Sequence, residues 1–242
     1  MKNFEKRKQD WLEEVCKDCH EFALKSNLDF YVFQTPIIYN PKLLIIGINP
    51  GGGKTYSEIL KEKNINKRTP ETLYYGENTL TNKPIWEIEA NLKGSDVLRD
   101  RIKRIFNDEN NLNILENSMM MNMFYFNTKK GKDIEGINLE IKQYCIEKTK
   151  EFIEIINPKN ILFLTSSNNN LKECSVKEIK IIGDNVKTGK LGNREVVAIP
   201  HYGFFSAYSH ENSKKIGKKL SEIFKYLNST YKCNFLGADN KQ

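Results

Sequence analysis

The chain has 242 residues, of which 39% are hydrophobic. This is enough to build one sizeable hydrophobic core, but it is small for two separate domains. It contains no run of about 18 apolar residues, which excludes a membrane-spanning helix. Its 38 Lys and Arg residues outnumber 31 Asp and Glu, and the net charge of +7 suits a polyanionic partner such as nucleic acid, or reflects a general bias toward Lys, Asn and Ile.

The N-terminal segment and the cysteines favour a cytoplasmic protein without disulfides. Residues 1–8 lack the apolar segment of a secretory signal, and the five cysteines are scattered and odd in number. Cys16–His20 reads CKDCH, the spelling of a c-type haem attachment site. The helical spacing of Trp11, Val15 and Cys19 instead places Cys19 on a buried face. Because no second cysteine pair has metal-ligand spacing, we predict buried structural cysteines and no metal or cofactor.

The first half of the chain predicts two helices and one buried strand. An amphipathic helix is predicted over about residues 5–26, and the continuous apolar run 42–48 is typical of a strand buried on both faces. Asn49–Gly53 follows as a loop, and residues 54–94 are polar enough to predict an irregular connection. A helix is expected from a Ser95 cap. Its apolar face comprises Leu98, Ile102, Ile105 and Phe106.

The second half alternates apolar runs with helices. Met119–Phe126 is a second apolar run, and a helix ending at Asn157-Pro158 follows it. Ile161–Leu164 and Val196–Ile199 predict two further strands. The last helix has an apolar face of Ile216, Leu220, Ile223, Phe224 and Leu227, and an opposite face of Lys214, Lys215, Lys218 and Lys219.

This alternation predicts an α/β fold, with three α/β/α layers around a central, mainly parallel four-stranded sheet. No repeat or linker divides the chain, so we predict a single domain over residues 1–242. Residues 1–40 would be an N-terminal helical extension and residues 228–242 a C-terminal tail. In such sheets ligands bind beyond the carboxyl ends of the strands, so the residues just after each apolar run are the candidates.

The loop after the first strand resembles a phosphate-binding P-loop only in part. The spelling Gly47-x5-Gly53-Lys54-Thr55 is one residue longer than G-x-x-x-x-G-K-[ST], and Pro50 removes a backbone donor. The third strand ends in Thr165-Ser166, without an Asp to hold magnesium. A P-loop-like nucleotide-binding protein is therefore a disfavoured alternative.

Three polar residues stand where a parallel sheet would bind its ligand. Asn49 follows the first strand, Asn122 interrupts the second apolar run, and His201 closes the fourth strand. A buried carboxamide without partners costs about 1–3 kcal/mol, and the edge of a nucleobase could pair with it as donor and acceptor together. Each residue also has an ordinary interpretation. Asn49 could form a turn, His201 could be a satisfied core histidine, and Asn122 could belong to an internal hydrogen-bond network.

Four segments around these residues resemble motifs of the uracil-DNA glycosylase superfamily. Gly47–Gly51 reads GINPG, like the first motif of the mismatch-specific branch and close to that of the single-strand-selective branch. Met119–Asn122 is similar to the strand that carries the base-reading Asn, and Ile161–Ser166 to the next strand. Val197–His201 resembles the second catalytic motif. The resemblance runs from about residue 40 to 227.

The resemblance implies a monofunctional DNA glycosylase, which flips a uracil or related base from DNA and hydrolyses its bond to the sugar in base excision repair. Asn49 would orient the attacking water through its side-chain carbonyl, and His201 would stabilise the departing base. Asn122 would read the pairing edge of the base. DNA is the implied partner, no cofactor is needed, and we expect a monomer.

Further residues receive roles from the same resemblance. Tyr75, in Tyr75-Gly76-Glu77, would stack on the base, with Tyr74 in reserve, unless both tyrosines simply pack under their loop. Ile48 would contact the base. Backbone amides of Gly51, Gly52 and Gly53, with Lys54 nearby, would bind DNA phosphate. Phe204 and Phe205 would fill the gap left by the base, or else pack beneath the last helix.

The chain departs from the family pattern at two positions. His201 is followed by Tyr202-Gly203-Phe204 where the family usually continues with Pro and Ser. Gly51 stands where the strictly uracil-specific branch has a bulky Tyr, which leaves room for a substituent on the base. A catalytically inactive member of the superfamily that only binds DNA is therefore the competing hypothesis.

Overall fold

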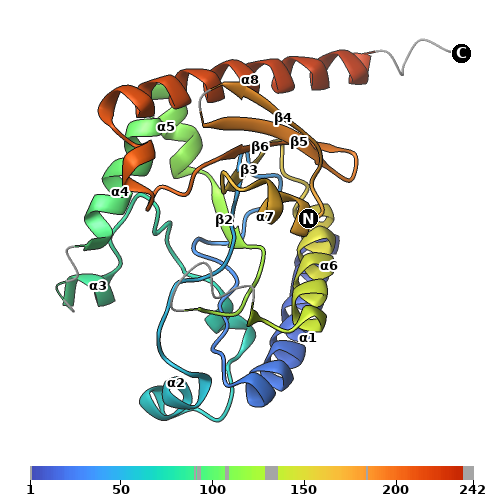
Figure 1. Cartoon of the computed structure of the whole chain (residues 1–242). Helices are drawn as coiled ribbons and strands as arrows, with labels where there is room; N and C mark the ends of the chain where they lie inside the picture. Colours follow the sequence, from blue (N-terminus) through green and yellow to red (C-terminus); the bar gives the residue numbers. More distant parts are fainter. Residues whose placement is uncertain are drawn as a thin grey trace, which may run out of the picture.

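The centre of the protein is a six-stranded mixed sheet, seen in the computed structural model, which describes residues 2–89, 91, 94–106, 109–128, 136–183 and 185–236 (Figure 1). The strand order is β2-β1-β3-β6-β5-β4. Their bounds are β1 (Leu44–Gly47), β2 (Met119–Asn122), β3 (Ile161–Leu164), β4 (Lys177–Gly183), β5 (Val186–Leu191) and β6 (Arg194–Ile199).

The four predicted strands form the parallel part of the sheet. β2, β1, β3 and β6 are parallel neighbours, with Ile45 in register with both Met120 and Leu162. The α/β class and the mainly parallel sheet are confirmed, but the prediction of four strands is wrong. β4 and β5 add an antiparallel hairpin. Its sequence lacks a buried apolar run because β4 is mostly exposed, and charged residues are usual on such an edge strand.

Successive residues of the parallel strands alternate between two cores. Leu44 and Ile46 of β1 belong to the core packed by α1 (Lys2–Ser26) and α6 (Leu139–Ile156). Leu43 and Ile45 belong to the core packed by α4 (Gly94–Ile105) and α8 (His210–Leu236). Helices therefore lie on both faces of the sheet, which explains why these strands read as continuous apolar runs (Figure 1).

The first helix is confirmed and is built into the core. α1 begins three residues before the predicted residue 5 and ends at Ser26. Cys19 is 0% exposed, as the helical spacing predicts, and Cys16 is 5% exposed. The segment expected as an N-terminal extension therefore supplies a large part of the core on the α1 side.

Residues 54–94 are more ordered than the predicted irregular connection. They contain α2 (Tyr56–Lys63), the short helix η1 (Pro70–Leu73) and α3 (Ile85–Glu89). α2 begins with a capping box in which Thr55 and Glu58 bond reciprocally. The sequence also gave no expectation of three short helices: α5 (Glu109–Glu116), α7 (Asn168–Glu173) and η3 (Phe205–Ala207).

The second apolar run leaves the sheet at Asn122, so Asn122 ends β2 and does not interrupt it. The segment before β1 runs antiparallel to residues 120–127 and covers the free edge of β2. Phe33 bridges Met121, and the Asn122 N–H donates to the carbonyl of Val32. This pairing brings Tyr31 and its neighbours beside the end of β2.

The last helix has the predicted faces. Ile216, Leu220 and Phe224 are buried and Ile223 is half-buried, whereas Lys214, Lys215 and Lys218 are exposed and Lys219 is half-buried. The side chain of Leu227 lies outside the described part of the chain. The helix continues to Leu236, so residues 228–236 of the expected tail are helical, and the remaining residues lie outside the described part of the chain. Among the helices of the described ranges, none combines the length and apolarity needed to cross a membrane.

Candidate functional site

The sheet topology places the three predicted polar residues at one edge. Asn122 is the last residue of β2, Asn49 comes two residues after β1, and His201 comes two residues after β6. Because these strands are parallel, their carboxyl ends meet at the same edge of the sheet. Ser95, the predicted cap of α4, lies outside the residues whose side chains are described, and α4 begins at Gly94.

Asn122 is packed over the end of β1 with its acceptor unpaired. The residue is 1% exposed, and its Nδ2 makes only long contacts to the carbonyls of Tyr31 (3.4 Å) and Val32 (3.5 Å). Its buried Oδ1 accepts no hydrogen bond from the residues described. A Cβ on Gly47 would lie 2.8 Å from this oxygen, so the carboxamide needs a glycine at that position. A complete internal hydrogen-bond network around Asn122 is therefore not present in the described residues.

Asn49 has a fixed orientation. Its Nδ2 donates to Thr128 Oγ1 at 2.7 Å and to the carbonyl of Pro50 at 3.1 Å. Within the described ranges its Oδ1 accepts no hydrogen bond, and the residue is half-buried. The amide end is thus held by protein, and the carbonyl end is left to bind water or a ligand.

His201 is exposed, so it is not the core histidine of the ordinary interpretation. Its Nδ1 accepts the Gly203 N–H at 3.0 Å, which places the proton of the neutral ring on Nε2. The imidazole stacks on Tyr202 with ring centroids 4.4 Å apart. Desolvation by surrounding protein lowers its pKa from 6.5. His201 is therefore a neutral donor through Nε2.

Tyr31 links Tyr75 to Asn122, because Tyr31 contacts both residues. The two tyrosine rings are 5.1 Å apart and their hydroxyls are hydrogen-bonded, while the Tyr31 carbonyl faces the Asn122 amide. Burial raises the pKa of Tyr75 above 10.0, and the charge of Glu87 adds to this. Tyr74 packs against the α1-side core. Of the two predicted stacking candidates, Tyr75 is thus the one that the fold brings to the site.

A small cavity lies beside Tyr202, the residue that follows His201. Its volume is about 120 Å³, and its lining includes Gln34, Glu87, Arg99 and Tyr202. Arg99 Nη1 donates to Glu87 at 2.8 Å. The lining of the cavity does not include Asn49, Asn122 or His201, so this cavity is not a pocket that the three residues share.

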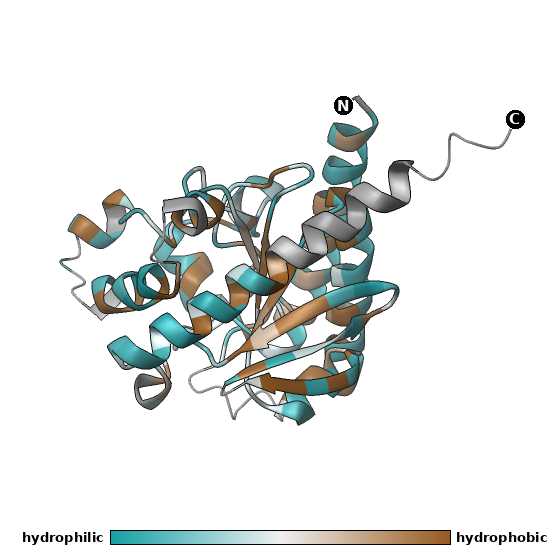
Figure 2. Cartoon of the chain, turned by 90° about the horizontal axis from the view of Figure 1, so that it is seen from above, coloured by the Kyte–Doolittle hydropathy of each residue, from teal (hydrophilic) through white to brown (hydrophobic). Residues whose placement is uncertain are grey.

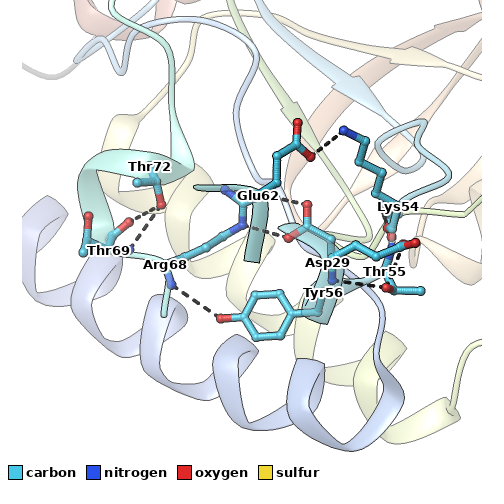
Figure 3. A network of polar contacts seen from close by, with 10 residues as sticks. Asp29, Lys54, Thr55, Tyr56, Glu62, Arg68, Thr69 and Thr72 are labelled. Atoms are coloured by element: carbon cyan, nitrogen blue, oxygen red, sulfur yellow. Dashed lines mark hydrogen bonds and ion pairs between the residues drawn. The ribbon is translucent and has the colours of Figure 1, made fainter. Parts of the chain in front are cut away.

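The glycine loop is exposed, but Lys54 and the N-terminus of α2 are already bonded to carboxylates of the protein. Lys54 Nζ is paired with the Glu62 carboxylate, and Glu58 accepts the Thr55 N–H at 2.7 Å (Figure 3). The helix start and the lysine that a P-loop would offer to phosphate are therefore engaged by the protein's own carboxylates. Gly51, Gly52 and Gly53 remain exposed.

Two other predicted contacts have mixed outcomes. Phe204 is 63% exposed, so it does not pack beneath the last helix, whereas the side chain of Phe205 lies outside the described part. Ile48 packs against the α1-side core. Asn122 instead shares the α4 side with Met120, because both approach the position of a Gly47 Cβ. Ile48 and the Asn122 carboxamide therefore face opposite sides of the sheet.

Sequence reasoning missed a buried ion pair beside the site. Arg68 donates to both carboxylate oxygens of Asp29 at 2.8 and 2.6 Å, and both residues are buried (Figure 3). The guanidinium carbon lies 5.9 Å from the Tyr31 ring. The signal was Asp29 within the apolar run 28–33, a charge that must find a partner when that run is buried.

The four cysteines whose side chains are described, Cys16, Cys19, Cys145 and Cys174, have no catalytic environment. Burial raises the pKa of Cys16 to about 11 and that of Cys145 to about 12, so their thiols stay protonated and unreactive. In the described ranges, no group of three or more His, Cys, Asp or Glu residues is arranged to hold a metal ion.

Comparison of the chain with protein-family models and with curated proteins finds no match. The functional interpretation therefore depends on the motifs, the strand order and the side-chain geometry.

Proposed function

We propose that this protein is a DNA glycosylase that hydrolyses the N-glycosidic bond of a flipped uracil or related modified base. The observation that carries the proposal is the buried, unpaired Oδ1 of Asn122 at the carboxyl edge of the parallel strands. A buried acceptor without a partner is costly, and it is accounted for if a nucleobase N–H pairs with it. The resemblance to the superfamily assigns base reading to this same Asn.

The mechanism divides the reaction between two residues. Asn49, whose Nδ2 is held by Thr128 and Pro50, would present its carbonyl oxygen to a water below the sugar carbon. Being neutral, it orients the water and does not act as a strong base. His201 would donate from Nε2 to a carbonyl oxygen of the departing base, stabilising the negative charge that develops there.

Base entry requires a local opening. Because Asn122 is 1% exposed, the base can reach it only after the side chains that cover it move. Tyr75 would then stack on the base, and the exposed Phe204 would occupy the space left in the DNA. A three-layer fold, a monomeric state, a cytoplasmic location and a role in base excision repair belong to the same proposal.

The decisive test is base release from synthetic DNA. Oligonucleotides containing uracil, hypoxanthine, mismatched thymine or hydroxymethylated bases are incubated with the protein, and abasic sites are cleaved with alkali. We expect strand breaks that Asn49→Ala reduces at least about a hundredfold and that the exposed control Asn169→Ala leaves unchanged. Salt-sensitive DNA binding without breaks on any of these substrates would contradict the proposal and favour an inactive, DNA-binding member.

A further inference from the structure

α4 and α8 cross in near-backbone contact beside the candidate site. A Cβ on Gly217 of α8 would lie 2.1 Å from the Ile105 carbonyl oxygen of α4, so only glycine permits this approach. Figure 1 shows the first half of α8 beside α4. Exposed and half-buried side chains within one turn of the crossing on either helix are therefore neighbours; those of α4 named below are half-buried and those of α8 exposed.

Those neighbouring side chains are basic. We call them the basic crossing, defined as Arg101, Lys103 and Arg104 of α4 and Lys214, Lys215 and Lys218 of α8. The first half of α8 shows hydrophilic positions along its exposed side in Figure 2. Among the side chains that the structure describes here, the acidic neighbours are Asp100, which is exposed, and Glu211, which pairs with Lys215 at 2.7 Å. The surface therefore keeps a net positive charge.

Two of these lysines have no counter-charge inside the molecule. Lys214 and Lys218 are exposed, four residues apart, and form no ion pair with the part of the chain that the structure describes. Like charges at this spacing destabilise a helix. On α1, at the other face of the sheet, Lys6 and Lys8 pair within the helix, and the exposed Lys17 and Lys25, which form no ion pair among the described residues, are separated by about two helical turns. The basic crossing thus resembles a surface whose counter-charge comes from another molecule.

The basic crossing is continuous with the His201 loop. Arg101 Nη1 donates to the carbonyls of Tyr202 (3.3 Å) and Gly203 (3.4 Å), and the N–H of Gly203 bonds to His201. The exposed Phe204 follows directly. A polyanion bound at the crossing would therefore extend to the residues proposed to act on the base.

The geometry points to the basic crossing as the surface that binds the phosphodiester backbone of the DNA flanking the extruded base. This inference rests on the proposed function. Lys214 and Lys218 contribute phosphate contacts from α8, and Arg101 links that surface to the loop that carries His201. These contacts set affinity and position and carry no sequence information.

The test compares two double charge reversals that change net charge equally. Lys214→Glu/Lys218→Glu alters the basic crossing, whereas Lys17→Glu/Lys25→Glu alters exposed lysines of α1 on the other face. Binding of a fluorescein-labelled duplex with one central uracil is measured by anisotropy at several salt concentrations. We expect the first pair to weaken binding at least about tenfold at low salt and to reduce the salt slope by about 2, while the control pair retains both.

Equal loss of affinity in both pairs, or an unchanged salt slope in the first, would overturn the inference. A second variant, Lys214→Ala/Lys218→Ala, should reduce the salt slope of DNA binding similarly. Its thermal unfolding is measured alongside, so that a loss of phosphate contacts can be told from misfolding. Single-turnover base release should be unchanged in the control pair, Lys17→Glu/Lys25→Glu. If the protein releases no base but the first pair lowers the salt slope, the basic crossing binds DNA and the glycosylase proposal is wrong. If the protein releases base but the first pair leaves the salt slope unchanged, the glycosylase proposal is supported and the basic crossing does not bind the DNA backbone.

Discussion

The protonation state of His201 is set by its immediate contacts. Its Nδ1 accepts the Gly203 N–H, and desolvation lowers its pKa from 6.5, so both favour the neutral ring. Base release should therefore rise with pH through a pKa below 6.5 and then level off. A single-turnover pH profile measures this, and His201→Gln should lack the inflection. A profile that falls as the pH rises through that range would contradict a neutral donor.

The same pKa shift has a consequence for stability. The unfolded chain binds a proton at His201 more readily than the native protein, so the native state loses stability as the pH falls from 6.5 through the lower native pKa. The pH dependence of unfolding should therefore flatten in this window when His201 is replaced by Gln.

The buried Arg68–Asp29 pair should dominate the local stability near Tyr31. Arg68→Met leaves the Asp29 carboxylate buried without its cation, and we expect a loss of about 3–5 kcal/mol in the free energy of unfolding, measured by denaturant titration. The control Lys83→Met breaks a partly exposed pair with Asp96 and should cost about 1 kcal/mol or less. Equal effects of the two variants would contradict the assignment.

At the level of elements, the contact between α4 and α8 depends on Gly217. Gly217→Ala would gain about 1 kcal/mol in helix propensity, but its methyl group would clash with the Ile105 carbonyl and force the helices apart. We expect a net loss of about 1–3 kcal/mol, seen as a lower melting temperature. Lys214→Ala on the exposed side of α8 should leave it nearly unchanged. A more stable Gly217→Ala variant would show that the helices separate freely.

The elements that could be predicted from the sequence are those whose burial produces an apolar pattern over neighbouring residues. β1 and β3 are buried on both faces, so each reads as an unbroken apolar run. α2 was not predicted because it lies in a polar stretch without a long apolar face. The only sequence signal for its start is the Thr55–Glu58 capping box. The β4–β5 hairpin was missed because an edge hairpin needs little apolar sequence.

At the level of the whole molecule, Trp11 joins three distant parts of the chain. Its ring lies 4.3 Å from Phe152 of α6 and 5.8 Å from Phe33, and its Nε1–H donates to the Lys148 carbonyl. Trp11→Ala should cost about 3–5 kcal/mol in unfolding free energy, because it leaves a cavity between α1 and α6. Trp11→Phe should cost clearly less. Denaturant unfolding of the two variants measures the difference, and equal losses would contradict a packing role.

The candidate site was only partly accessible to sequence reasoning. Asn49, Asn122 and His201 could be proposed because each follows an apolar run, and parallel pairing brings those ends to one edge. The closure of Asn122 and the contact between Tyr31 and Tyr75 could not, because they depend on how the segment before β1 packs against β2.

The sequence by itself determined the α/β class, the parallel strands and the polar residues at their ends, because burial periodicity and strand-ending residues are local properties. Tertiary structure decided the six-stranded sheet, the fixed amide of Asn49 and the link between α4 and the His201 loop. Asn49 and Thr128 are 79 residues apart in the chain, and Arg101 and Tyr202 are 101 apart. Residues this far apart come into contact only when the whole chain packs, so a local sequence pattern does not predict these contacts.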